Sequence, residues 1–157
     1  MLVSYGRGAL SLILITLRSV TLAHVEAAKG KGTVLVIDDS QVVLDVVRAR
    51  LERQGYRVVT LDSPLGAARA MLREKPDVVL MDLEMPALSG DRAAAVLQRS
   101  LADTAPIVLH TSLKEDEVSA RAVACHAAGF LLKTESDAEF VTRFEAIMAR
   151  IGRRSRA

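Results

Sequence analysis

The sequence predicts an α/β protein: one five-stranded parallel sheet with helices on both faces, in a doubly wound (βα)5 arrangement. Five short apolar runs, rich in β-branched residues, lie roughly 20–30 residues apart, which is too far for hairpins and suits βα units. The runs are continuous rather than alternating, as expected of strands that are buried on both faces. They are Val34–Ile37, Val58–Leu61, Val78–Met81, Ile107–Leu109 and Phe130–Leu132.

The stretches between these runs have helical patterns. Val43, Val47 and Leu51 form an apolar stripe with helical spacing, and Gly55 is suited to end that helix. An Ala-rich helix is expected over Val118–Ala128, and a last helix is expected to reach Ile151 before Gly152 ends it.

Three sites have the residues that begin helices. Ser63 precedes a proline, which is favoured in the first helical turn. Two segments match the capping box, in which a serine and a glutamate three residues later each bind the other's backbone N–H group. These segments are Ser112-Leu113-Lys114-Glu115 and Ser136-Asp137-Ala138-Glu139.

We expect three parts in the chain of 157 residues. Residues 1–32 would be an extension, poorly ordered or the result of a start codon placed too far upstream. Residues 33–151 would be the folded domain, and residues 152–157 a basic tail. Residues 9–17 are apolar and faintly resemble a signal peptide, but Arg18 follows directly, so membrane contact is not expected and the protein is expected in the cytoplasm.

Charge and composition exclude several function classes. The net charge of +2 divides into +3 for residues 1–32, −5 for residues 33–149 and +4 for residues 150–157, so the expected domain is acidic. Aromatic residues make up only 3% of the chain, so no nucleic-acid partner is expected. The lone cysteine, Cys125, excludes an intrachain disulfide and a cysteine-rich zinc site.

Polar residues follow the strands of the predicted sheet, where ligands of open parallel sheets bind. Asp38 and Asp39 follow the first strand, Asp82 the third, Thr111 the fourth and Lys133 the fifth. The three carboxylates would repel one another, and a Mg²⁺ ion, which prefers oxygen ligands, would relieve that repulsion. With Mg²⁺ and Lys133 the charges balance, and such a site can accept a phosphoryl group.

Four segments in order resemble the receiver domain of bacterial two-component response regulators, of the stand-alone, single-domain type. The resemblance covers about residues 33–151 and implies a flavodoxin-like receiver fold. The segments are Val36-Ile37-Asp38-Asp39-Ser40, Asp82-Leu83-Glu84-Met85-Pro86-Ala87-Leu88-Ser89-Gly90, Pro106-Ile107-Val108-Leu109-His110-Thr111-Ser112 and Gly129-Phe130-Leu131-Leu132-Lys133.

The resemblance implies a role for each site residue. Asp82 resembles the phosphoacceptor, and Lys133 resembles the lysine that pairs with the phosphoryl group. Thr111 resembles the hydroxyl that contacts a phosphoryl oxygen, and with Phe130 it forms the expected switch. The implied Mg²⁺ ligands are Asp39, Asp82 and the backbone carbonyl of Glu84, with Asp38 holding metal-bound water.

The sequence departs from the family pattern at three positions. Thr134 follows Lys133, where the family often has proline. The switch aromatic is Phe130, which has no hydroxyl. Glu84 is longer and more acidic than the small polar residue often found two places after the acceptor.

Each site residue also has a simpler interpretation. Asp38 and Asp39 could cap the first helix, Thr111 could be a turn hydroxyl, and Lys133 a solvated residue at a strand end. His110 is expected to be a packed or surface histidine rather than a phosphorylated one.

The resemblance implies that Asp82 receives a phosphoryl group from a sensor histidine kinase or a histidine phosphotransfer protein. The output would be phosphorylation-dependent binding of an unknown downstream protein to the face formed by residues 113–151. The protein would not be an enzyme beyond its own aspartyl phosphorylation and dephosphorylation. Two alternatives remain: a haloacid-dehalogenase-type phosphatase, and a phosphorylation-independent scaffold with a vestigial site.

Overall fold

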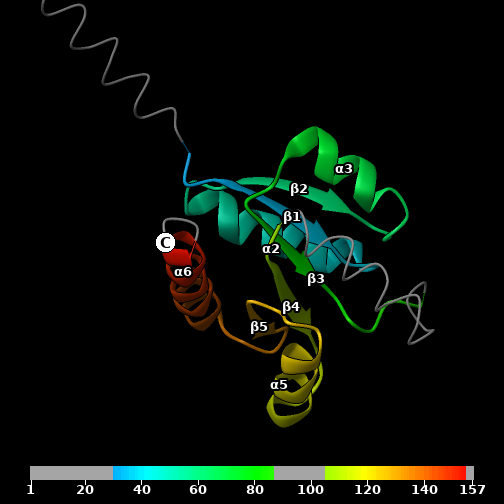
Figure 1. Cartoon of the computed structure of the whole chain (residues 1–157), viewed down its shortest axis with the longest axis vertical. Helices are drawn as coiled ribbons and strands as arrows, with labels where there is room; N and C mark the ends of the chain where they lie inside the picture. The colour runs from blue at the N-terminus through cyan, green and yellow to red at the C-terminus, as the bar shows by residue number, and fades with distance from the viewer. Residues whose placement is uncertain (1–29, 87–104, 155–157) are drawn as a thin grey trace, which may run out of the picture. The chain divides into compact units, whose positions relative to one another are not determined.

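The computed structural model describes residues 30–86 and 105–154. Within these ranges the chain forms five strands and four helices (Figure 1). The strands are β1 (Thr33–Ile37), β2 (Arg57–Leu61), β3 (Val78–Met81), β4 (Ile107–Thr111) and β5 (Gly129–Leu132). The helices are α2 (Gln41–Arg53), α3 (Ala67–Glu74), α5 (Glu115–Ala124) and α6 (Asp137–Arg154).

The strands form one parallel sheet in the order β2-β1-β3-β4-β5. This confirms the predicted fold class and all five predicted strands, whose ends shift by at most two residues. A helix between β3 and β4 would complete the (βα)5 pattern, but that stretch falls largely on residues 87–104, outside the described residues. Most of the expected N-terminal extension and the last three residues of the chain also lie outside them.

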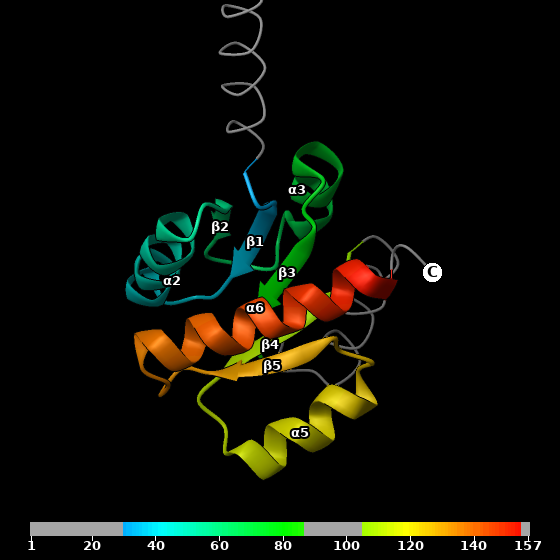
Figure 2. The ribbon, with the colours of Figure 1, turned by 90° about the vertical axis from the view of Figure 1, so that its left-hand side faces the viewer.

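Successive strand residues enter two separate apolar clusters, one on each face of the sheet. Leu35 and Ile37 of β1 pack with α3 and α5, whereas Val34 and Val36 pack with α2 and α6. Because both faces are covered, the strands carry continuous apolar runs. β5 lies at an edge of the sheet, with α6 on one side of it and α5 on the other (Figure 2).

The predicted end of α2 and the predicted start of α6 are confirmed. Ser40 caps α2 by accepting from the Val43 N–H, and Gly55, with φ of +90°, follows the end of the helix. The capping box before α6 is confirmed: the Ser136 N–H donates to the Glu139 carboxylate over 2.9 Å, and the Glu139 N–H donates to the Ser136 hydroxyl over 3.4 Å.

Two predicted helix starts are wrong. The Ser63 hydroxyl accepts only from the nearby Leu65 N–H, in a local turn, and α3 begins at Ala67. The capping box at Ser112 does not form, because the Ser112 N–H donates to Glu84 and Lys114 takes the N-cap position of α5.

Two predicted helix ends also differ. α5 ends at Ala124 rather than Ala128, since Cys125 caps it and His126 adopts a left-handed φ of +54°. α6 continues through Gly152 to Arg154, because an isolated glycine costs a helix only about 1 kcal/mol.

Candidate functional site

The strand register brings the predicted site residues to one edge of the sheet. Ile37 of β1 pairs with Met81 of β3, so Asp38 and Asp82, which follow them, leave the sheet at the same level. Thr111 ends β4 and pairs with Leu132 of β5, which places Lys133 beside them. The simpler interpretations of these residues therefore do not account for their convergence.

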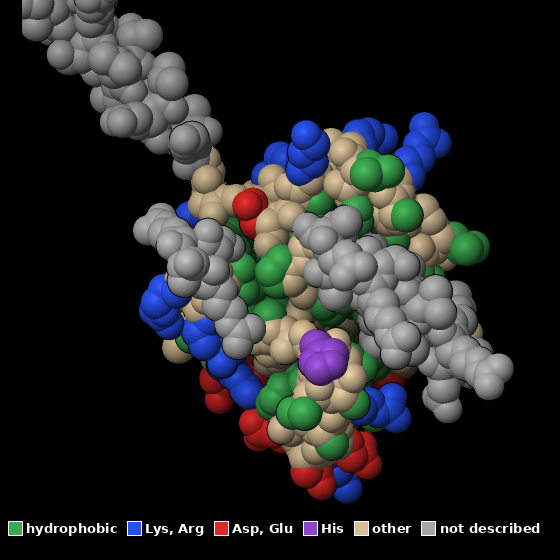
Figure 3. All heavy atoms as spheres, viewed as in Figure 1, with side chains coloured by type: hydrophobic (Ala, Val, Ile, Leu, Met, Phe, Trp, Pro, Cys, Tyr) green, Lys and Arg blue, Asp and Glu red, His purple; other side chains and the backbone are tan. Residues whose placement is uncertain are grey.

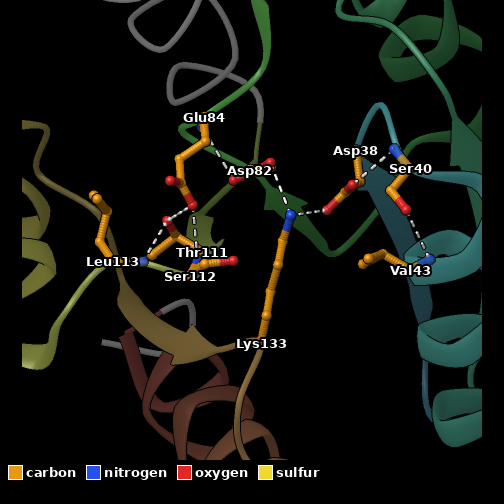
Figure 4. A network of polar contacts seen from close by, with 9 residues as sticks. All are labelled: Asp38, Ser40, Val43, Asp82, Glu84, Thr111, Ser112, Leu113 and Lys133. Atoms are coloured by element: carbon orange, nitrogen blue, oxygen red, sulfur yellow. Dashed lines mark hydrogen bonds and ion pairs between the residues drawn. The ribbon is translucent and has the colours of Figure 1, made fainter.

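Lys133 lies between two buried carboxylates (Figure 4). Its Nζ donates to Asp82 Oδ2 over 2.8 Å and lies 2.8 Å from Asp38 Oδ2. Asp38 and Asp82 are only 1% and 2% exposed, so both carboxylates depend on neighbouring donors in place of water. Backbone N–H groups supply two: Ser40 donates to Asp38 Oδ1 and Glu84 to Asp82 Oδ1, each over 3.0 Å.

The donor set fits a hard divalent cation. Asp38, Asp39 and Asp82 each offer a carboxylate oxygen, and these oxygens lie within 4.8 Å of one another. Asp38 Oδ2 is buried, and the Lys133 ammonium lies 2.8 Å from it. Because Mg²⁺ prefers oxygen ligands and retains some of its water, the exposed Asp39 suits the open side of such a site.

The pKa values at the site follow from burial and from Lys133. Burial raises the pKa of Asp38 above its ordinary 3.8, although the Lys133 and Ser40 hydrogen bonds oppose this. Burial lowers the pKa of Lys133, but the hydrogen bonds and charges of Asp38 and Asp82 outweigh it, so the net pKa is raised. Lys133 therefore stays protonated at neutral pH.

Thr111 has a partner that the sequence analysis did not anticipate. Its buried hydroxyl donates to Glu84 Oε2 over 3.1 Å, and the Ser112 N–H donates to the same oxygen over 2.9 Å. The sequence indicated the Glu84 backbone carbonyl as a metal ligand and its side chain as unusually long and acidic for this position, but it indicated no partner for the carboxylate. Its position two residues after Asp82 was the available signal, but the direction of the side chain depends on the loop after β3.

The expected switch residues face the same side of the sheet. Phe130 pairs with Leu109, and Leu132 pairs with Thr111, so these four side chains lie on the side covered by α3 and α5. Phe130 is half-buried, and the Arg143 guanidinium lies 5.0 Å from its ring centroid. The Phe130 ring therefore connects the core beside Thr111 with the surface of α6.

His110 points to the opposite side of β4. It is 3% exposed, and its ring packs edge-on against Phe140 with centroids 5.7 Å apart. Burial, reinforced by the charge of Lys133, lowers its pKa to about 4, so the ring is neutral at neutral pH. The structure thus agrees with the packed-histidine interpretation.

The family model of the response regulator receiver domain matches residues 34–145. The chain belongs to this family. Among the described residues, no helix has both the length and the apolar character needed to cross a bilayer.

Related receivers occur alone and within longer proteins. The chain is 33% identical over 117 residues to the transcriptional regulatory protein KdpE of Mycobacterium tuberculosis, covering 74% of this chain and 51% of KdpE. It is 27% identical over 117 residues to PilH of Pseudomonas aeruginosa, covering 74% of this chain and 97% of PilH. The chain thus spans about half the length of KdpE but almost all of PilH.

A solved receiver shares the fold. The BeF3-activated N-terminal receiver domain of Klebsiella pneumoniae RstA has a TM-score of 0.64 and is 29% identical, covering 74% of this chain and 97% of that one.

The raised pKa of Asp38 predicts a pH-dependent gain in stability for Asp38→Asn in Mg²⁺-free buffer. At pH 7 the ionised carboxyl destabilises the folded state, and as the pH falls through its raised folded-state pKa towards 3.8 this penalty disappears. Urea unfolding should therefore show the variant to be more stable than the parent at pH 7, with a difference that shrinks on acidification. Asp62→Asn, an exposed acid after β2, is the control. A variant less stable than the parent at pH 7 would contradict this account of Asp38.

Proposed function

We propose that Asp82 accepts a phosphoryl group from a sensor histidine kinase or a histidine phosphotransfer protein, and that the chain signals by binding another protein when phosphorylated. The observation that carries the proposal is the position of the Lys133 ammonium, 2.8 Å from both the Asp38 and Asp82 carboxylates, beside the exposed Asp39. This arrangement places a cation beside the nucleophilic carboxylate, where phosphoryl charge arrives.

The transfer needs little from the protein beyond positioning and charge. An oxygen of Asp82 attacks the phosphorus of a phosphohistidine, a P–O bond forms, the P–N bond breaks, and the imidazole takes the electron pair. Lys133 remains close enough to pair with a phosphoryl oxygen. Asp38, Asp39, Asp82 and the Glu84 backbone carbonyl would hold Mg²⁺, which when bound neutralises the charge of the transferred group.

An apolar surface near the site suits docking of the phosphodonor. Val42 and Val46 lie on the first half of α2, a few residues after Asp38 and Asp39, and are 73% and 42% exposed. The two side chains are four residues apart and so share one face of the helix, where a partner could contact both. We place the exchange, and the protein, in the cytoplasm.

The output surface is the face formed by residues 113–151. A groove of about 820 Å³ runs between α5 and α6 and is lined by apolar side chains, among them Val123 and Ile147, and by arginines of α6. Figure 3 shows Lys or Arg side chains over α6 next to hydrophobic side chains of α5. Arg150 and Arg153 favour a downstream partner that presents an apolar segment with acidic residues, whereas Arg143 is already paired with Glu115 and Glu135.

Two residues would couple Asp82 to this groove. The Thr111 hydroxyl would turn towards a phosphoryl oxygen, and Phe130, on the same side of the sheet, would move with it. Because Phe130 lines the groove and lies under Arg143, its movement would change the groove's shape and charge. The phosphoryl group can shift this equilibrium only by interacting differently with the two states.

The phosphatase alternative is not favoured. That chemistry needs an acid two residues after the nucleophile to act as a general acid on the leaving group, but the Glu84 carboxylate is bound to Thr111 and Ser112. A vestigial scaffold is also less well supported, because the acids, the hydroxyl and the lysine are all present and converge.

Acetyl phosphate with Mg²⁺ should add one acid-labile phosphoryl group to the chain, and Asp82→Asn should abolish it, because Asp82, which follows β3 and binds Lys133, is the proposed acceptor. Intact-mass measurement and phosphate-affinity electrophoresis would detect the modification. Asp62→Asn should be labelled like the parent. Undiminished labelling of Asp82→Asn would remove the assignment.

Thr111→Ala and Phe130→Ala should keep the label on Asp82 but weaken its effect on residues 113–151. Hydrogen–deuterium exchange with and without beryllium fluoride and Mg²⁺ would measure that effect. Thr142→Ala is the matched control, since its hydroxyl donates to the Ala138 carbonyl within α6. If both variants show the full change of the parent, the switch does not run through these residues.

A further inference from the structure

The Glu84 carboxylate binds two hydrogen-bond donors that, under the proposed function, would bind the phosphoryl group on Asp82. One carboxylate oxygen, Glu84 Oε2, accepts from the Thr111 hydroxyl over 3.1 Å and from the Ser112 backbone N–H over 2.9 Å. Figure 4 shows the carboxylate directed towards Thr111 and Ser112. An anionic oxygen with two converging donors is the arrangement that a phosphoryl oxygen would adopt at the same place.

Two further donors, the Lys133 ammonium and the Glu84 N–H group, bind the Asp82 carboxylate. Lys133 donates to Asp82 Oδ2, and the Glu84 N–H donates to Oδ1, so both belong to the acceptor carboxylate itself. The Thr111 hydroxyl and Ser112 N–H thus form a separate donor pair at the edge where a group on Asp82 would extend. In the unphosphorylated chain that pair is already satisfied by the Glu84 side chain.

We propose that the Glu84 carboxylate is a built-in competitor of the phosphoryl group, holding Thr111 and Ser112 in the unphosphorylated arrangement. The inference rests on the proposed function. A phosphoryl group on Asp82 carries at least one full negative charge, so it repels the Glu84 carboxylate at short range. Phosphorylation must therefore displace Glu84, and the Thr111–Ser112 pair exchanges one anion for another.

The displacement is feasible because Glu84 is exposed whereas Thr111 is fully buried. The released carboxylate regains water, and the buried hydroxyl exchanges one acceptor for another without being left unpaired. Glu84 is thus a positioning residue that opposes phosphorylation and restores the unphosphorylated arrangement when the phosphoryl group leaves.

The test is the affinity of the full chain for beryllium fluoride, a phosphoryl mimic, at Mg²⁺ concentrations that saturate each variant. Saturation matters because removing a carboxylate near the acids can also weaken Mg²⁺ binding. Glu84→Ala should bind beryllium fluoride at least about tenfold more tightly than the parent, because the mimic no longer has to break the two hydrogen bonds of the Glu84 carboxylate. Glu84→Gln, which keeps an acceptor without the charge, should lie between them.

Glu52→Ala, which removes an exposed carboxylate near the end of α2, is the control for net charge and should match the parent. The amide resonance of Ser112 provides a second readout. It should shift in Glu84→Ala without ligand, and beryllium fluoride should then move it more than in the parent, in which one anionic acceptor only replaces another.

The outcomes separate this inference from the proposed function. Equal or weaker beryllium fluoride binding by Glu84→Ala, with Asp82 still labelled by acetyl phosphate, would overturn the role of Glu84 alone. Absence of labelling and of beryllium fluoride binding in the parent and every variant would overturn the proposed function and this inference with it.

Discussion

The Lys133 ammonium stabilises the cluster of acidic residues at the carboxyl ends of the strands. Asp38 and Asp82 are buried at the ends of neighbouring strands, and two ionised carboxylates so placed would repel each other without a cation between them. Lys133 lies 2.8 Å from both because β5 ends beside β4. The parallel register and the order of the strands thus determine the chemistry.

Lys133 neutralises only part of the negative charge at the site. One ammonium faces three carboxylates, and the raised pKa of Asp38 shows that burial still penalises its ionised form. A site with excess negative charge favours a divalent cation, which would balance the site for the phosphoryl group of the proposed function. Glu84 adds a further anion, which is bound to Thr111 and Ser112.

The fold and most of the site could be predicted from the sequence, because both depend on which residues form the strands. Continuous apolar runs identify parallel strands, and the residues after them must meet at one edge, which is why Asp38, Asp82 and Lys133 were found together. The Glu84 contacts could not be predicted, since they depend on the path of the loop after β3. The same contacts explain why the capping box at Ser112 failed: its backbone N–H already has a partner.

Calorimetric titration of the full chain with Mg²⁺ tests the central claim most directly, namely that an under-compensated acid cluster forms the site. The account predicts one bound Mg²⁺ per chain and an affinity that falls by at least about tenfold in Asp39→Ala, because a direct ligand should matter as much as the partners that orient such ligands. Asp62→Asn should bind like the parent. An unchanged Mg²⁺ affinity in Asp39→Ala would contradict the account.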